Sequence, residues 1–113
     1  MIIIFKTNKL RKTCNTFKLS EREFGTDQAR KLRQRLDELF AAETLEDINH
    51  LPPPRCHELK HNLKGKFSVD LRHPYRLIFE PAEEPVPLKE DGGIDKSKVR
   101  TIRILIVEDT HGK

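Results

Sequence analysis

Residues 67–80 read FSVDLRHPYRLIFE, with an apolar side chain at every second position on each side of His73-Pro74. A period of two is the pattern of a strand that buries one face, and the His-Pro step favours a turn. The segment is therefore predicted to be a β-hairpin with one face on the core. Arg76 would lie on the face opposite Leu77.

Further strands are predicted on both sides of this hairpin. Residues 99–107 read VRTIRILIV, a largely buried strand, and residues 56–62 can pair with the hairpin through a turn at Lys64-Gly65. An Ile-rich run at residues 2–6 opens the chain as another strand. We therefore expect four to five strands that are mainly antiparallel.

The spacing of apolar residues changes to that of a helix between the first strand and the prolines at 52–54. Leu10, Cys14 and Phe17 predict a short amphipathic helix, and a capping box of Ser20 and Glu23 is expected to begin a long one of about six turns. The apolar residues of the long helix recur at helical spacing: Ala29, Leu32, Leu36, Leu39 and Phe40.

A second cap at Thr44 and Asp47 predicts one short turn, in which Leu45, Ile48 and Leu51 point inward. The order of elements predicts a single α+β domain over residues 1–113, with an N-terminal strand and two helices packed on the sheet. A long exposed loop rich in proline, glycine and acidic residues is expected at about 81–98.

Charge is concentrated in one segment of the chain. Lys and Arg total 22 against 18 Asp and Glu, a net charge of +4, and the segment from Arg55 to Arg76 alone holds six cations and two anions. Such a cluster indicates a surface that faces a polyanion, although a solvated sheet face with scattered cations would give the same count. The chain has only two cysteines and no apolar run of membrane length, so a cytoplasmic location without a membrane partner is expected.

The candidate chemical groups lie in three clusters: residues 55–66, Arg76 in the hairpin, and residues 108–111. Each cluster alone is also explained as ordinary surface, but together they offer imidazole, guanidinium, ammonium and carboxylate groups if adjacent strands bring them close. His57 and His61 on one strand would be roughly 13 Å apart, too far to bind one metal. No metal or other cofactor is expected.

Four segments of the sequence resemble a known family. RCHELK at 55–60, KGKFSV at 64–69, YRLIF at 75–79 and the ending Asp109-Thr110-His111 are similar to the HigB-type toxins, also called plasmid maintenance system killer proteins. These toxins belong to the RelE/ParE superfamily, and the resemblance extends over nearly the whole chain. The family's usual aspartate–tyrosine–histidine ending reads Asp109-Thr110-His111 here.

The resemblance implies the toxin of a type II toxin–antitoxin system with a RelE/ParE-like fold. Such a toxin is a ribosome-dependent mRNA endoribonuclease that acts in the ribosomal A site, inhibits translation and needs no metal. Its implied partners are a helix-turn-helix antitoxin of the HigA type, the ribosome and mRNA. Operator DNA would be bound only through the antitoxin.

The resemblance also implies roles for individual residues. It assigns the catalytic site to His57, Arg76, Asp109 and His111. The cations expected to bind RNA and the ribosome are Arg55, Lys60, Lys64, Lys66 and Arg72.

The chemistry of these groups suits the cleavage of RNA. An imidazole can accept or donate a proton near neutral pH, and a guanidinium fork can hold a phosphate. Which of His57 and His111 is the acid and which the base stays open. Two alternatives are a ParE-like poison of DNA gyrase and a catalytically degenerate module that only binds an antitoxin.

Overall fold

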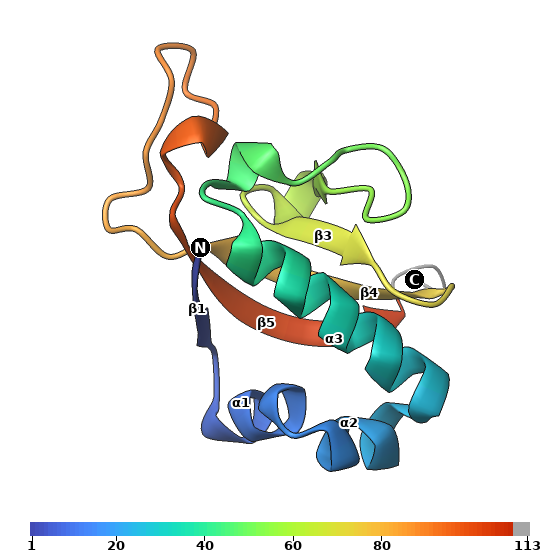
Figure 1. The fold of residues 1–113 in the computed structure, drawn as a ribbon. Coiled ribbons are helices and arrows are strands. Elements are labelled where there is room, and N and C mark those ends of the chain that lie inside the picture. Colours follow the sequence, from blue (N-terminus) through green and yellow to red (C-terminus); the bar gives the residue numbers. More distant parts are fainter. Residues whose placement is uncertain (110–113) are drawn as a thin grey trace.

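Five strands form one sheet in the order β1-β5-β4-β3-β2 in the computed structural model, which describes residues 1–109 (Figure 1). The strands are β1 (Ile2–Phe5), β2 (His57–Glu58), β3 (Phe67–Asp70), β4 (Tyr75–Pro81) and β5 (Thr101–Asp109). β1 pairs with β5 in parallel, and the other neighbouring pairs are antiparallel. The predicted α+β class and mainly antiparallel sheet are confirmed.

The predicted hairpin is β3 and β4. Phe67 pairs with Phe79 and Val69 with Leu77 across the two strands, and all four side chains are buried. The rings of Phe67 and Phe79 stack with their centroids 6.1 Å apart. Alternation therefore predicted correctly that these four side chains enter the core, but not the exposure of Tyr75. The strand expected at 56–62 is shorter, because only β2 is extended and a 3₁₀ turn follows at His61–Leu63.

Three helices precede the hairpin: α1 (Asn8–Asn15), α2 (Phe17–Phe24) and α3 (Thr26–Ala41). The predicted long helix from Ser20 is therefore wrong at its start. Gly25 has a φ of +86° and separates α2 from α3, since this left-handed region favours glycine. Ser20 does not cap a helix: it is buried within α2, where its hydroxyl donates to the carbonyl of Thr13.

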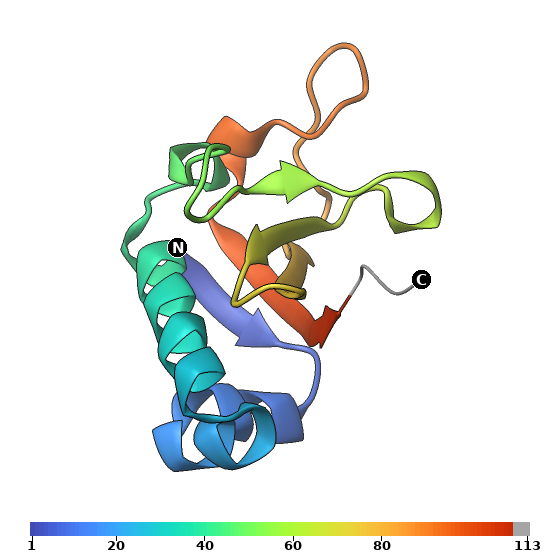
Figure 2. The same cartoon turned by 90° about the vertical axis from the view of Figure 1, so that its right-hand side faces the viewer.

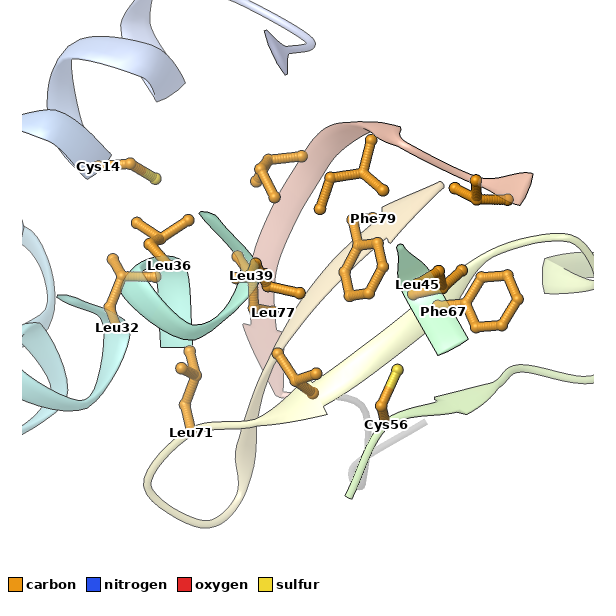
Figure 3. Packing of buried hydrophobic residues seen from close by; sticks show 14 residues of the cluster. Cys14, Leu32, Leu36, Leu39, Leu45, Cys56, Phe67, Leu71, Leu77 and Phe79 are labelled. Atoms are coloured by element: carbon orange, nitrogen blue, oxygen red, sulfur yellow. The ribbon is translucent and has the colours of Figure 1, made fainter. Parts of the chain in front are cut away.

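The core lies between α3 and one face of the sheet (Figure 3). Leu32, Leu36 and Leu39 of α3 contribute to it, as do the buried residues of β4 and β5. Two residues expected to point inward do not, because Phe40 is 70% and Leu51 56% exposed. The cap predicted at Thr44 and Asp47 is confirmed as a capping box that begins a short 3₁₀ turn.

The loop expected at about 81–98 projects from the sheet between β4 and β5 (Figures 1 and 2). Its base is anchored by Glu83, whose Oε2 accepts hydrogen bonds from the backbone N–H groups of Arg100 and Thr101. A bridge between Leu88 and Ile94 closes its outer part. Across residues 1–109, no helix has the length and apolar character needed to cross a membrane.

Candidate active site

One face of the sheet carries most of the candidate chemical groups. The core covers the face that holds Phe67 and Leu77, and the helices α1 to α3 do not pack on the opposite face (Figure 2). This opposite face is called here the open face, although Ser68 and Ile78 on it are buried. Strand register and alternation assign the following residues to it: His57, Ser68, Asp70, Arg76, Ile78, Glu80, Arg103, Ile106 and Glu108. β2, β3, β4 and β5 all contribute to this face.

Asp70 is the centre of an arginine cluster on the open face. Its carboxylate accepts hydrogen bonds from Nε and Nη2 of Arg55, at 2.7 and 2.8 Å, and its Oδ1 lies 3.8 Å from Nε of Arg76. The hydrogen bond to Asp70 raises the pKa of Arg55 above its ordinary value, so this guanidinium keeps its charge. One carboxylate thus contacts two guanidinium groups, and Glu108 is the register partner of Arg76 on the neighbouring strand β5.

The backbone around Arg55 is fixed from the core side by Arg35 of α3. The Arg35 side chain is 2% exposed and donates to the carbonyls of Asp70 and Pro53, at 2.7 and 2.9 Å. Arg55 itself has a φ of +49°, a left-handed conformation that aims its side chain at Asp70. Arg35 follows Leu32 by three residues, and this spacing places it on the buried stripe of α3.

His57 follows Arg55 by two residues and has one defined ring contact. Its Nδ1 lies 3.0 Å from the backbone carbonyl of Arg55. A carbonyl only accepts, so Nδ1 carries the proton and Nε2 of the neutral ring is the acceptor. The register partner of His57 is Ser68, whose buried hydroxyl makes no hydrogen bond within residues 1–109.

The predicted RNA-binding cations do not all lie together. Lys60, Lys64 and Lys66 belong to the turn that joins β2 to the start of β3, whereas Arg55 lies beside the end of β3 at Asp70. The length of β3 therefore separates the lysine turn from the arginine cluster, by roughly 10 Å.

Arg72 is exposed in the turn between β3 and β4, at the same end of β3 as Asp70. The side chain of Gln28 in α3 holds this turn by accepting from the N–H of Arg72 at 2.8 Å and donating to its carbonyl at 3.2 Å. Like Arg35, Gln28 is a buried polar residue that connects α3 to the site.

The C-terminal cluster is only partly described. Asp109 is the last residue of β5 and pairs in register with Tyr75. His111 lies outside the described residues. Tyr75 is the chain's sole tyrosine and is 40% exposed, although the alternation of the hairpin predicted it on the core face. It lines a cavity of about 50 Å³ together with Arg55, Asp70, Leu71, His73 and Pro74.

Thiolate chemistry is absent from this site at neutral pH. Burial raises the pKa of Cys56 to about 11, so the thiol next to His57 stays protonated. Within residues 1–109, no group of three or more His, Cys, Asp or Glu side chains is placed to bind a metal ion.

Comparison with known proteins identifies relatives of this chain in sequence and in fold. A family model described as the RelE-like toxin of the type II toxin–antitoxin system HigB matches residues 4–87. The match covers most of the chain and includes Arg55, His57, Asp70 and Arg76. No curated protein sequence matches the chain.

Two solved structures have the same fold over nearly their whole length. A YoeB/ParE toxin from Agrobacterium tumefaciens shares 7% identity at a TM-score of 0.56, covering 98% of this chain and 100% of that one. A YoeB–YefM complex from Staphylococcus aureus shares 17% identity at a TM-score of 0.53, covering 96% of this chain and 94% of that one. At such low identity the similarity is one of fold.

Proposed function

Because this chain belongs to the HigB-like family of RelE-like toxins from type II toxin–antitoxin systems, we propose that it is a ribosome-dependent endoribonuclease that cuts mRNA and stops translation. The observation that carries the proposal is the arginine cluster of the open face. There Asp70 contacts both Arg55 and Arg76, and His57 belongs to the same face, with its Nδ1 hydrogen-bonded to the Arg55 carbonyl.

RNA supplies its own nucleophile for this reaction. The 2′-oxygen attacks the adjacent phosphorus while the bond from phosphorus to the 5′-oxygen breaks, leaving a 2′,3′-cyclic phosphate and a free 5′-hydroxyl. The 2′-hydroxyl loses a proton and the 5′-oxygen gains one, so atoms and charge balance without an added reactant. The protein needs a proton acceptor, a proton donor and cations near the phosphorane.

His57 is the proton acceptor in this proposal. The hydrogen bond from Nδ1 to the Arg55 carbonyl fixes the ring and leaves Nε2 free to take the 2′-hydroxyl proton. We assign the donor role to His111, which lies outside the described residues. In this proposal, His57 is therefore the base and His111 the acid.

Arg76 and Arg55 stabilise the charge that develops on the phosphorane. Each guanidinium has five N–H donors, and the two that Arg55 gives to Asp70 leave others for phosphate oxygens. The Arg76 side chain is only 15% exposed, which strengthens its electrostatic effect. Arg72 and the lysines of the 59–66 turn would bind the flanking RNA backbone and the ribosome.

Tyr75 and Asp109 would contact the base next to the cut. The exposed ring of Tyr75 offers a surface on which a base can stack, and the carboxylate of its register partner can accept from a base N–H group. In the cell, the proposed antitoxin is a helix-turn-helix protein of the HigA type, and the complex would bind operator DNA through it.

Primer extension on an mRNA translated in vitro tests the proposed function. Added protein should produce discrete cuts only when ribosomes are present, and His57→Ala or Arg76→Ala should remove them. Cuts in naked mRNA, or translation that continues undisturbed, would contradict the proposal. DNA damage that depends on gyrase would indicate the poison instead.

A further inference from the structure

A second cationic surface lies on α1 and α2, away from the open face. The segment from Lys6 to Arg22 contains six Lys or Arg residues and one Glu, a local charge of +5 in a chain whose net charge is +4. The six cations are all exposed: Lys6, Lys9, Arg11, Lys12, Lys18 and Arg22. This local charge is similar to that of the segment from Arg55 to Arg76, with its six cations and two anions, so the chain has two cationic regions.

These cations differ from those of the open face in their pairing. Arg55 and Arg76 contact Asp70, and Arg103 pairs with Glu80. None of the six cations of the α1–α2 surface forms an ion pair within residues 1–109. Like charges on one small surface repel one another, and binding a polyanion relieves that repulsion.

The α1–α2 surface also has a defined shape. A groove of about 420 Å³ runs between the two helices, and Lys9, Lys12 and Arg22 line it together with Thr13, Leu19 and Glu23. Lys9 and Lys12 are one helical turn apart, so their ammonium groups extend from the same side of α1. In Figures 1 and 2, these helices lie beside the lower end of α3, on a different side of the molecule from the open face.

We propose that the α1–α2 surface binds the phosphate backbone of folded RNA, with ribosomal RNA as its occupant. Lysines act as point charges that suit phosphates in many geometries, and the neighbouring exposed Thr7, Asn8, Asn15 and Thr16 can hydrogen-bond to phosphate and 2′-hydroxyl groups. The naming of ribosomal RNA rests on the proposed function. Binding by the surface itself does not require cleavage.

A protein with two separate RNA-binding surfaces can bind the ribosome through one of them first. The contact made by the second surface is then intramolecular. The α1–α2 surface would hold the protein on the ribosome while the open face engages one phosphodiester of the mRNA. Binding by the α1–α2 surface would raise the effective concentration of the open face near the mRNA. It would not change the chemistry of cleavage. Loss of the α1–α2 surface should therefore raise KM and leave the rate at saturating ribosome concentration unchanged.

The test compares two triple variants that change the charge equally. The first variant reverses the charge of three groove residues of the α1–α2 surface: Lys9→Glu/Lys12→Glu/Arg22→Glu. The second reverses the charge of three exposed lysines in the 82–98 loop: Lys89→Glu/Lys96→Glu/Lys98→Glu. Binding of each purified protein to 70S ribosomes is measured between 50 and 200 mM salt, with the far-ultraviolet circular dichroism of each variant as the check on folding.

The α1–α2 variant should bind ribosomes at least about ten-fold more weakly, and its log–log salt slope should be shallower than that of the wild type by roughly 2 to 3. The loop variant should keep most of the wild-type affinity for ribosomes and most of the wild-type salt slope. Equal binding by the two variants overturns the inference. So does an α1–α2 variant that keeps its ribosome affinity but loses binding to poly-L-glutamate, since the occupant is then an acidic polypeptide.

Failure of the proposed function gives a different result. If the wild-type protein binds ribosomes through α1 and α2 but cuts no mRNA, the inference stands and the nuclease proposal fails. If it cuts mRNA and the α1–α2 variant cuts with an unchanged KM, the nuclease proposal stands and the inference fails.

Discussion

Arg55 donates two hydrogen bonds to the carboxylate of Asp70, at 2.7 and 2.8 Å, although the two residues are 15 positions apart in the chain. Nε of Arg76 lies 3.8 Å from the same carboxylate, so Asp70 forms ion pairs with both guanidinium groups. We expect this anion to help position the two guanidinium groups of the proposed site. The open face offers a matched ion pair for comparison, Arg103 with Glu80 at 2.8 Å, whose side chains are similarly exposed.

Asp70→Asn should separate positioning from stability. The amide keeps the shape of the side chain but loses the charge that holds Arg55 and Arg76, so mRNA cleavage should fall about 100-fold. The free energy of unfolding in urea should fall by about 1 kcal/mol, since the pair is partly exposed to solvent. Glu80→Gln is the control and should cost similar stability while cleavage continues. Equal activity of the two variants would show that Asp70 is only structural.

Arg76→Ala should lower the rate of ribosome-dependent cleavage by about 100- to 1,000-fold, because it removes a cation from the phosphorane. Arg76→Lys should recover only part of the rate, since an ammonium group cannot form the two-point contact. Arg103→Ala, on the neighbouring strand of the same face, should keep nearly full activity. Growth arrest by a well-folded Arg76→Ala protein would refute the assignment of this residue.

His57→Ala should reduce cleavage by about 100- to 10,000-fold, the range for loss of a general base. His61→Ala is the control, because His61 is exposed in the following turn. Two-bond ¹⁵N–¹H correlation spectra of the free protein should show the proton of neutral His57 on Nδ1, as the contact with the Arg55 carbonyl requires. A proton on Nε2 would exclude this ring as the acceptor in the form described here.

Tyr75 gives the protein its own optical probe. The chain contains one tyrosine and no tryptophan, so its tyrosine fluorescence reports on Tyr75 alone. A short single-stranded RNA should quench this fluorescence by stacking on the ring. Tyr75→Phe should cleave normally, whereas Tyr75→Ala should lose about 1–3 kcal/mol of affinity for the base. Unchanged fluorescence at RNA concentrations that saturate binding would place the bases elsewhere.

The two buried thiols should make stability fall in alkaline solution. Burial raises the pKa of both Cys14 and Cys56 to about 11, from an ordinary value of 9.0. Because the folded state then favours the neutral thiol, their contribution is complete below pH 9 and is lost as the pH rises from about 9 to 11.

Urea unfolding midpoints across this pH range measure the effect, and Cys14→Ala/Cys56→Ala should flatten the curve. Native protein should also resist alkylation by iodoacetamide at pH 8 and react once unfolded in urea. Rapid alkylation of Cys56 in the folded protein would contradict the burial argument.

The sequence predicted those parts of the fold that depend on local pattern. Alternation located the hairpin of β3 and β4, and the Thr44–Asp47 box located a short turn. The division of α2 from α3 was missed because a serine followed by a glutamate three residues later is a capping pattern, while Gly25 alone is a weak signal. Its left-handed φ shows that it ends a helix here.

The site was harder to predict because it depends on register between strands. Arg76 and His57 were identified through a family resemblance, and their roles remain proposals. Asp70 was counted only as a charge, since nothing in the sequence says that it lies beside Arg55. The buried Arg35 and Gln28, which tie α3 to the site, were missed because residues of these types are usually exposed.

The sheet order has a consequence for biosynthesis. β5 follows every other described element in the chain, yet it lies inside the sheet, between β1 and β4. During translation, β1 and the hairpin therefore leave the ribosome before the strand that joins them exists. The arginine cluster cannot gain its neighbour Glu108 until this last strand emerges, so a half-made chain lacks a finished open face.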